Sequence, residues 1–176
     1  MLALLAFRLA WGLVGGRWSR FASFLPTPAR LRSHFAHQEG KVTSPGHSPL
    51  GALSVFALLA VLLAQVGTGL LSDDEIAFAG PLTRFVSGEW VSQATWYHKD
   101  VGQFLLLGLV ALHLAAIVFY ALVRRQALVG PMVHGDRQLP GATPASRDDA
   151  LSRAGAALVA ALSALLAWWV ASLGAF

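Results

Sequence analysis

The chain has 176 residues, of which 56% are hydrophobic and only 12% are charged, and its net charge is +4. This composition excludes an ordinary soluble domain, because such a domain needs more charged surface. Cysteine is absent, which excludes disulfides, thiolate metal sites, iron–sulfur clusters and covalent haem attachment. The basic residues lie between apolar stretches instead of on one soluble face, so they indicate membrane topology and not nucleic-acid binding.

The first apolar stretch, Met1 to Gly15, is short and contains Arg8 near its middle. A helix needs about 20 residues to cross a bilayer. A secretory signal peptide would carry its charge before the apolar region and a cleavage site after it, which does not fit this stretch. We therefore expect a partial span, and a natural start of the chain upstream of Met1.

Three longer apolar stretches cover residues 49–71, 101–123 and 154–176. Each reaches the length of a membrane span, and without water to pair the backbone groups each should be helical. We predict an all-α transmembrane helical bundle with three full spans plus the N-terminal partial span. In the last span, Ala156, Ala160 and Ala164 recur every four residues and predict a close helix-packing face.

The polar segments between the spans alternate in charge. Segments 16–48 and 124–153 are rich in arginine, whereas segment 72–96 is acidic. The positive-inside rule then predicts that the two basic loops are cytoplasmic and that the 72–96 loop is periplasmic. Part of the acidic segment, Asp73 to Glu89, is expected to form a short helix on the membrane surface.

Two histidines mark the span 101–123 as the place for chemistry, because ionisable groups in a membrane are costly. His113 lies inside this span and His98 lies at its outer end, fifteen residues apart. On a helix that separation is about 22 Å of rise and roughly 60° of rotation. The spacing suits one imidazole for each of two stacked haems. The alternatives are a packing hydrogen bond or proton relay for His113, and a wet surface histidine for His98.

Three stretches match motifs of one known family. They are Phe7–Gly15, the Gly-His-Ser-Pro-Leu-Gly motif of Gly46–Gly51, and the region from Tyr97 to Tyr120 with its Tyr-His-Lys-Asp-Val-Gly start. The last region resembles the last core helix of the bacterial cytochrome b561 and nickel–iron hydrogenase b-type cytochrome family. In that family Gly102, Ala115 and Ala116 would leave room for a flat porphyrin. The resemblance covers about Leu4 to Arg125.

The resemblance implies a membrane-bound b-type cytochrome subunit in a bacterial inner membrane, not a self-contained enzyme. It would pass electrons between a quinone pool and a redox partner, such as a hydrogenase or a c-type cytochrome, with membrane lipid around it and a homodimer as one possible assembly. The cofactor would be haem b, one or two per chain, with His98 and His113 as axial ligands of the iron. His47 and Arg8 would be further cofactor contacts, although His47 could instead cap a helix and Arg8 could extend to the interface.

The resemblance also divides the chain into a cytochrome b-like domain over 1–125, a cytoplasmic linker over 126–153 and an additional span over 154–176. The family's other haem histidines lie on a first span and at the start of the second, which this sequence does not contain. Each haem would therefore need a second ligand not visible in this chain, since His34, His37 and His134 fall in predicted loops. The alternatives are a non-redox membrane anchor or transporter component, and a truncated haem-free remnant.

Overall fold

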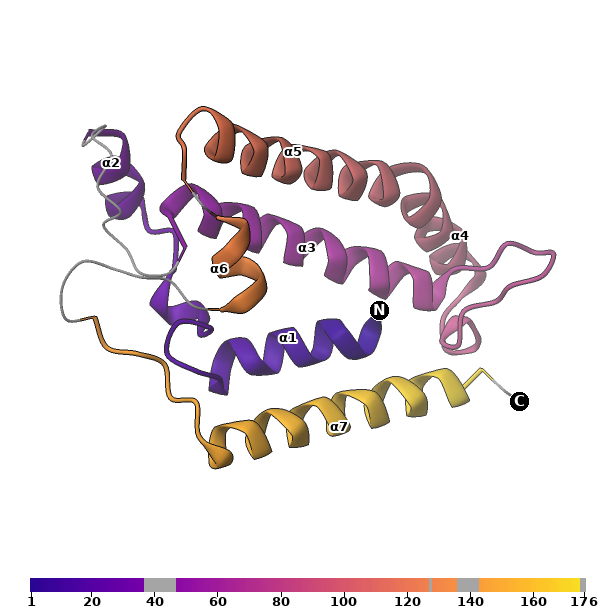
Figure 1. Ribbon diagram of the computed structural model, residues 1–176. Coiled ribbons are helices and arrows are strands. Elements are labelled where there is room, and N and C mark those ends of the chain that lie inside the picture. Colours follow the sequence, from indigo (N-terminus) through magenta and orange to yellow (C-terminus); the bar gives the residue numbers. More distant parts are fainter. Residues whose placement is uncertain (37–46, 127, 136–142, 175–176) are drawn as a thin grey trace.

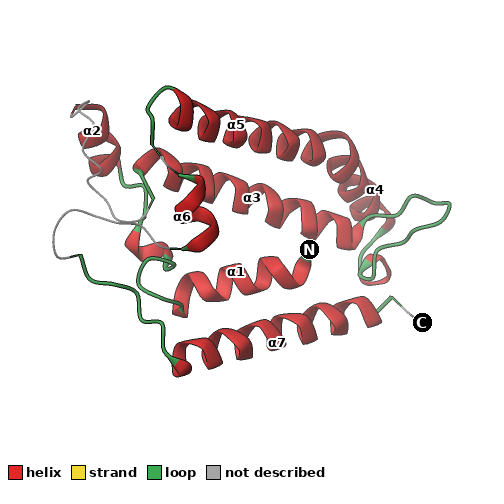
Figure 2. Cartoon of the chain, in the orientation of Figure 1, coloured by secondary structure: helices red, strands yellow, loops and turns green. Residues whose placement is uncertain are grey.

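The structure is a computed structural model and describes residues 1–36, 47–126, 128–135 and 143–174. The described residues are helices joined by loops (Figure 2), with one isolated β-bridge between Asp73 and Ala79. The α-helices are α1 (Leu2–Val14), α2 (Pro28–Ala36), α3 (Pro49–Leu71), α4 (Gly88–Trp96), α5 (Gln103–Leu122), α6 (Val129–His134) and α7 (Ala150–Ser172).

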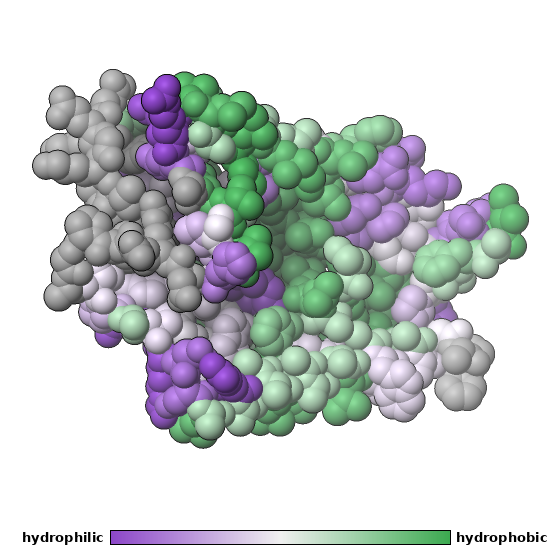
Figure 3. Space-filling view, in the orientation of Figure 1, coloured by the Kyte–Doolittle hydropathy of each residue, from purple (hydrophilic) through white to green (hydrophobic). Residues whose placement is uncertain are grey.

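Four helices lie side by side in the order α5, α3, α1, α7 (Figure 1), and contacts join each to the next. Neighbours in this layer run in opposite directions. One end of the bundle, here called the acidic end, carries the 72–87 connection. The other, the basic end, carries the arginine-rich segments that precede α3 and follow α5. Apolar surface covers the helices between these two more polar ends (Figure 3).

Among the described residues, three helices are long and apolar enough to cross a membrane, namely Pro49–Leu71, Gly88–Leu122 and Ala150–Ser172. Leu2–Val14 is a shorter apolar helix. Large apolar side chains on these helices point outward, as Leu107 does with 61% of its surface exposed. A bilayer must cover such a surface. The predicted all-α bundle of three full spans plus a partial span is confirmed, and the chain is a multi-pass membrane protein.

The second span begins earlier than the sequence suggested. Helix α4, a π-helical turn named η3 (Tyr97–Gly102) and α5 run on as one 35-residue helix. The expected surface helix over Asp73–Glu89 is not formed, since a loop and one 3₁₀ turn, η2 (Thr83–Phe85), occupy most of this segment. The Asp74 carboxylate accepts hydrogen bonds from the backbone of Ile76, Ala77 and Phe78. Such bonds compete with helical ones.

Side chains with short polar groups fix where two spans begin. Ser48 accepts a hydrogen bond from the Gly51 backbone at 3.1 Å, and Pro49 opens the first turn of α3. Asp149 and Ser152 form a reciprocal capping box at the start of α7. Helix α7 therefore starts four residues before the predicted span, and the segment predicted as a linker contains helix α6 as well.

Helix α7 packs on α1 through a face that the sequence did not predict. Ser163 and Val170 are buried, whereas Ala160 and Ala164 are exposed. The packed face therefore lies beside the predicted alanine face, rotated from it by about 70° at 100° per residue, and the half-buried Ala156 lies between the two. Both ends of α7 are also held: the Trp18 indole donates to the Pro144 carbonyl before the helix, and Arg84 donates to the Leu173 carbonyl at its end.

Candidate functional site

His98 lies in the π-helical turn η3, half-buried against α3. Its Nδ1 is 2.9 Å from the backbone carbonyl of Gln65, and the Gln65 side-chain amide donates to the His98 carbonyl, also at 2.9 Å. A carbonyl only accepts, so in a neutral ring Nδ1 carries the proton and Nε2 keeps its lone pair. Metal-ligating histidines in proteins are held in this manner.

Gly69 gives the His98 ring its place. A Cβ built on Gly69 would lie 2.8 Å from Cε1 and 3.1 Å from Nδ1 of His98. Real Cβ atoms do not approach so closely, so any other residue at this position would push the ring away from the Gln65 carbonyl. Neither Gln65 nor Gly69 was a predicted site residue. The available signal was a polar amide inside an apolar helix, four residues before a glycine.

Gly102 has a different role from the one expected. We predicted that its missing side chain would make room for a porphyrin. The structure fills this space with protein, since a Cβ on Gly102 would lie 2.0 Å from Gln65 Oε1 and 2.7 Å from Tyr97 Cε1. Ala115 and Ala116 are exposed on α5. Because their side chains are small, the outer surface of α5 is recessed at these two positions, and no described residue covers them.

His113 is half-buried on α5, in a helix whose other side chains are mostly apolar. Its imidazole makes no hydrogen bond to any described residue. The packing hydrogen bond considered for it is therefore absent from this part of the chain. His113 lies about 22 Å from His98 along the helix, towards the basic end. The described residues contain no group of three or more His, Cys, Asp or Glu that could hold a metal ion together.

His47 and Arg8 lie together at the basic end. The His47 ring packs at a tilt against the Phe24 ring with centroids 4.5 Å apart, and Phe24 is the most buried large side chain among the described residues, at 1% exposure. Burial lowers the pKa of His47, and the nearby charge of Arg8 lowers it further. The Arg8 guanidinium lies 4.7 Å above the Phe21 ring and donates to the Ser19 carbonyl, so it extends to the basic interface.

The structure thus brings together only two of the four predicted site residues. It joins Arg8 to His47 and keeps both away from His98, because α3 separates the basic end from Gln65 by about 25 Å of helix. His47 does not cap α3, since Ser48 does so. Of the three other histidines considered, His134 ends α6 with an exposed side chain, and His37 lies outside the described residues. His34 lies on α2 and not in a loop.

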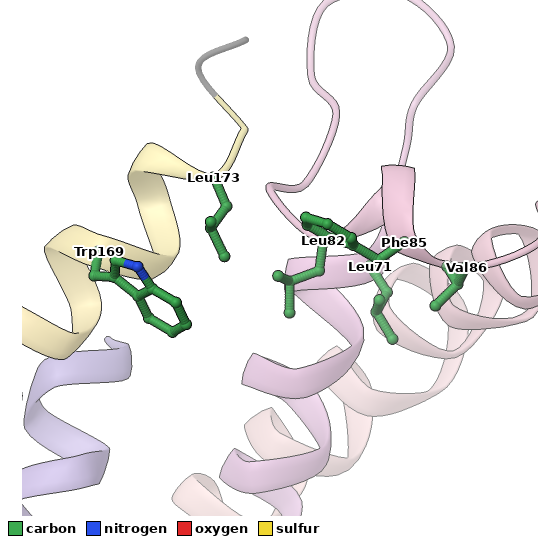
Figure 4. Close-up of a pocket in the computed structure, with 6 residues that line it drawn as sticks. All are labelled: Leu71, Leu82, Phe85, Val86, Trp169 and Leu173. Atoms are coloured by element: carbon green, nitrogen blue, oxygen red, sulfur yellow. The ribbon is translucent and has the colours of Figure 1, made fainter.

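An apolar pocket of about 460 Å³ opens at the acidic end between the last turns of α7 and α3 (Figure 4). Its lining consists of Leu71, Leu82, Phe85, Val86, Trp169 and Leu173. None of these side chains can ligate iron or titrate, so the pocket does not belong to the histidine site.

The fold defines an all-helical, multi-pass membrane protein with imidazoles at two depths of one long helix. The model of the family described as prokaryotic cytochrome b561 matches residues 1–135, and the chain belongs to this family. The chain is also similar to a protein of Bradyrhizobium diazoefficiens named as a probable Ni/Fe-hydrogenase B-type cytochrome subunit. The two are 26% identical over 74% of this chain and 59% of the relative. The chain therefore spans about three fifths of that relative's length. No solved structure matches it.

Proposed function

We propose that the chain is a membrane-bound b-type cytochrome subunit that carries electrons, with His98 and His113 as axial ligands of two haem b groups. The observation that carries this proposal is the hydrogen bond from His98 Nδ1 to the Gln65 carbonyl. This hydrogen bond fixes the ring and leaves the lone pair of Nε2 free, as an imidazole ligand of haem iron requires. Membership of the cytochrome b561 family supports haem, and not a bare metal ion, as the group that these histidines bind.

The donor set fits haem in part. His98 and His113 each offer one nitrogen, and they lie too far apart on one helix to serve the same iron. Among the described residues, neither histidine belongs to a group of three or more His, Cys, Asp or Glu side chains that could hold a metal ion. The second ligand of each haem would therefore come from outside the described residues, either from another segment of a longer protein or from a second copy of the chain. When bound, haem supplies reversible one-electron chemistry.

The two haems bound along this helix would carry electrons from one membrane face to the other. With one ligand near the acidic end and one nearer the basic end, the bilayer is divided into shorter steps. The arginine-rich segments 16–48 and 124–153 favour the cytoplasmic side for the basic end and the periplasmic side for the 72–96 segment, in a bacterial inner membrane. The electrons would pass between a quinone pool and a redox partner. The name of the relative favours a hydrogenase, and a c-type cytochrome is the alternative.

Arg8 and His47 would serve the haem nearer the basic end. The Arg8 guanidinium suits a haem propionate, because the two are oppositely charged and Arg8 already reaches the interface. His47 would contact the same region as a neutral ring, since its pKa is lowered. The roles of both residues rest on their position together at this end.

The test is a reduced-minus-oxidised visible spectrum of the detergent-purified protein, expressed from Met1 and from any in-frame start upstream. We expect a b-type α-band, with about half lost in His98→Ala and about half in His113→Ala. His134→Ala is the matched control, because His134 is exposed on α6. Unchanged haem in both variants would contradict the ligand assignment. No band at either length would contradict the cytochrome and leave a membrane anchor as the function.

A further inference from the structure

Gln65 occupies a position where an apolar residue would be expected. It lies in the third quarter of α3, a helix of almost wholly apolar side chains, and its side chain is half-buried against the π-helical turn η3. The amide Oε1 is buried and has no hydrogen-bond partner in the described part of the chain. Burying an acceptor without a donor is unfavourable. This cost calls for an offsetting interaction at the other end of the Gln65 side chain, the amide nitrogen.

That interaction is a reciprocal pair of hydrogen bonds with His98. The Gln65 Nε2 donates to the His98 backbone carbonyl, and the Gln65 carbonyl accepts from His98 Nδ1, each at 2.9 Å. The amide orientation is unambiguous, because only the nitrogen end can face a carbonyl. One residue therefore holds both the backbone and the ring of His98.

The π-helical turn explains why such a clamp is needed. A π-turn is rare, is less favourable than the regular helix and is frequent at functional sites. Here it spans Tyr97–Gly102 and includes His98. Two glycines open the space for the clamp: Gly69 admits the imidazole, and Gly102 admits the Gln65 amide, whose Oε1 would lie 2.0 Å from a Cβ there. Both glycines thus make room for the Gln65–His98 pair.

We propose that Gln65 is the positioning residue for His98: its side-chain amide stabilises the π-helical turn and so keeps the ring on the Gln65 carbonyl, with Nε2 directed to the iron. This inference rests on the proposed function. Gln65 itself touches no reacting atom. Its contribution is to the geometry of the ligand, so its loss should alter the electronic state of one haem and leave the other unchanged.

The experiment compares Gln65→Leu with Gln103→Leu in the purified, haem-loaded protein. Gln103 is an exposed glutamine directly after the same turn, which makes it a matched control. Two kinds of measurement are made: hydrogen exchange of the amides in residues 97–102, and the haem signals, namely the midpoint potential and the low-spin ferric resonance of each haem. In Gln65→Leu we expect up to about tenfold faster exchange in the turn, together with a shifted potential and resonance for one haem. Gln103→Leu should change neither.

Four outcomes decide the matter. A wild-type protein without a b-type spectrum means that the proposed function itself fails, whatever the exchange data show. Faster exchange with both haem signals unchanged makes Gln65 merely structural and overturns the inference, as do unchanged exchange and unchanged haem. Faster exchange with one altered haem supports it. If Gln65→Leu does not accumulate, Gly102→Ala displaces the same amide, and Gly108→Ala, with no atom within 4 Å of its Cβ position, is its control.

Discussion

Gly69 and His98 meet where α3 and the long second helix touch, and a Cβ on Gly69 would lie 2.8 Å from the ring. Gly67, two residues earlier on α3, has no atom within 4 Å of its own Cβ position. We predict that Gly69→Ala turns the imidazole away from the Gln65 carbonyl and removes one haem signal. Gly67→Ala should keep both signals and change stability by about 1 kcal/mol or less, in the stabilising direction. Equal haem content in the two variants, measured by the α-band, would contradict this geometry.

The α1–α7 interface predicts a contrast between two neighbouring residues. Ser163 is buried at 6% exposure, whereas Ala164 is exposed on the outer side of α7. Ser163→Leu should overpack the interface and destabilise the protein by about 1–3 kcal/mol. Ala164→Leu should have little effect, because its side chain points to lipid. Thermal unfolding in detergent measures both. If Ala164→Leu proves the more harmful, the packed face of α7 is the one first predicted from the alanine spacing.

The Asp74 loop should respond to acid. Hydrogen bonds from the backbone of Phe78, Ala77 and Ile76 lower the pKa of Asp74 from 3.8 to about 2. Because the folded loop lowers this pKa, its stabilising effect is complete above about pH 4 and is lost as the pH falls towards 2. Asp74→Asn retains an acceptor but has no charge to titrate, so the loop should lose this pH dependence. The amide shifts of residues 76–78 across this range measure it, and an unchanged pH dependence in the variant would contradict the assignment.

The Arg8–His47 pair predicts a second titration. Burial on Phe24 lowers the pKa of His47 below 6.5, and the Arg8 charge contributes second. For a histidine with a lowered pKa, the unfolded chain takes up the proton first. The stabilising effect is thus complete above about pH 6.5 and is lost as the pH falls through the folded pKa. Arg8→Gln removes only the second cause, so the pKa should rise but stay below 6.5. An NMR titration of the His47 ring measures it, and an unchanged pKa in Arg8→Gln would show that the charges do not interact.

The helices and their membrane character could be predicted from the sequence, because they depend on local properties. Twenty apolar residues in a row must form a helix in a bilayer, whatever the neighbouring segments do. The spans at 49–71 and 154–176 were found for this reason, with helix starts set by Ser48 and Asp149 in the structure. The motif around Tyr97 to Gly102 led to the family, and the family is confirmed by a match over residues 1–135.

Local composition did not predict which faces meet. The alanine spacing of α7 predicted one packing face, but in the contact of α7 with α1 the buried residues of α7 are Ser163 and Val170. The apolar residues of the acidic loop predicted a helix there. Instead, the Asp74 carboxylate accepts three backbone hydrogen bonds, which compete with those of a helix.

Hydropathy and motif spacing along the chain were enough to predict a helical membrane protein of the cytochrome b561 family, with His98 and His113 on one span. The pairing of His98 with Gln65 on a different helix, and the space that Gly69 and Gly102 leave for this pair, became evident only in the folded arrangement. The reason is physical: hydropathy and periodicity act along one helix, whereas a hydrogen bond between residues 33 positions apart depends on how two helices are placed.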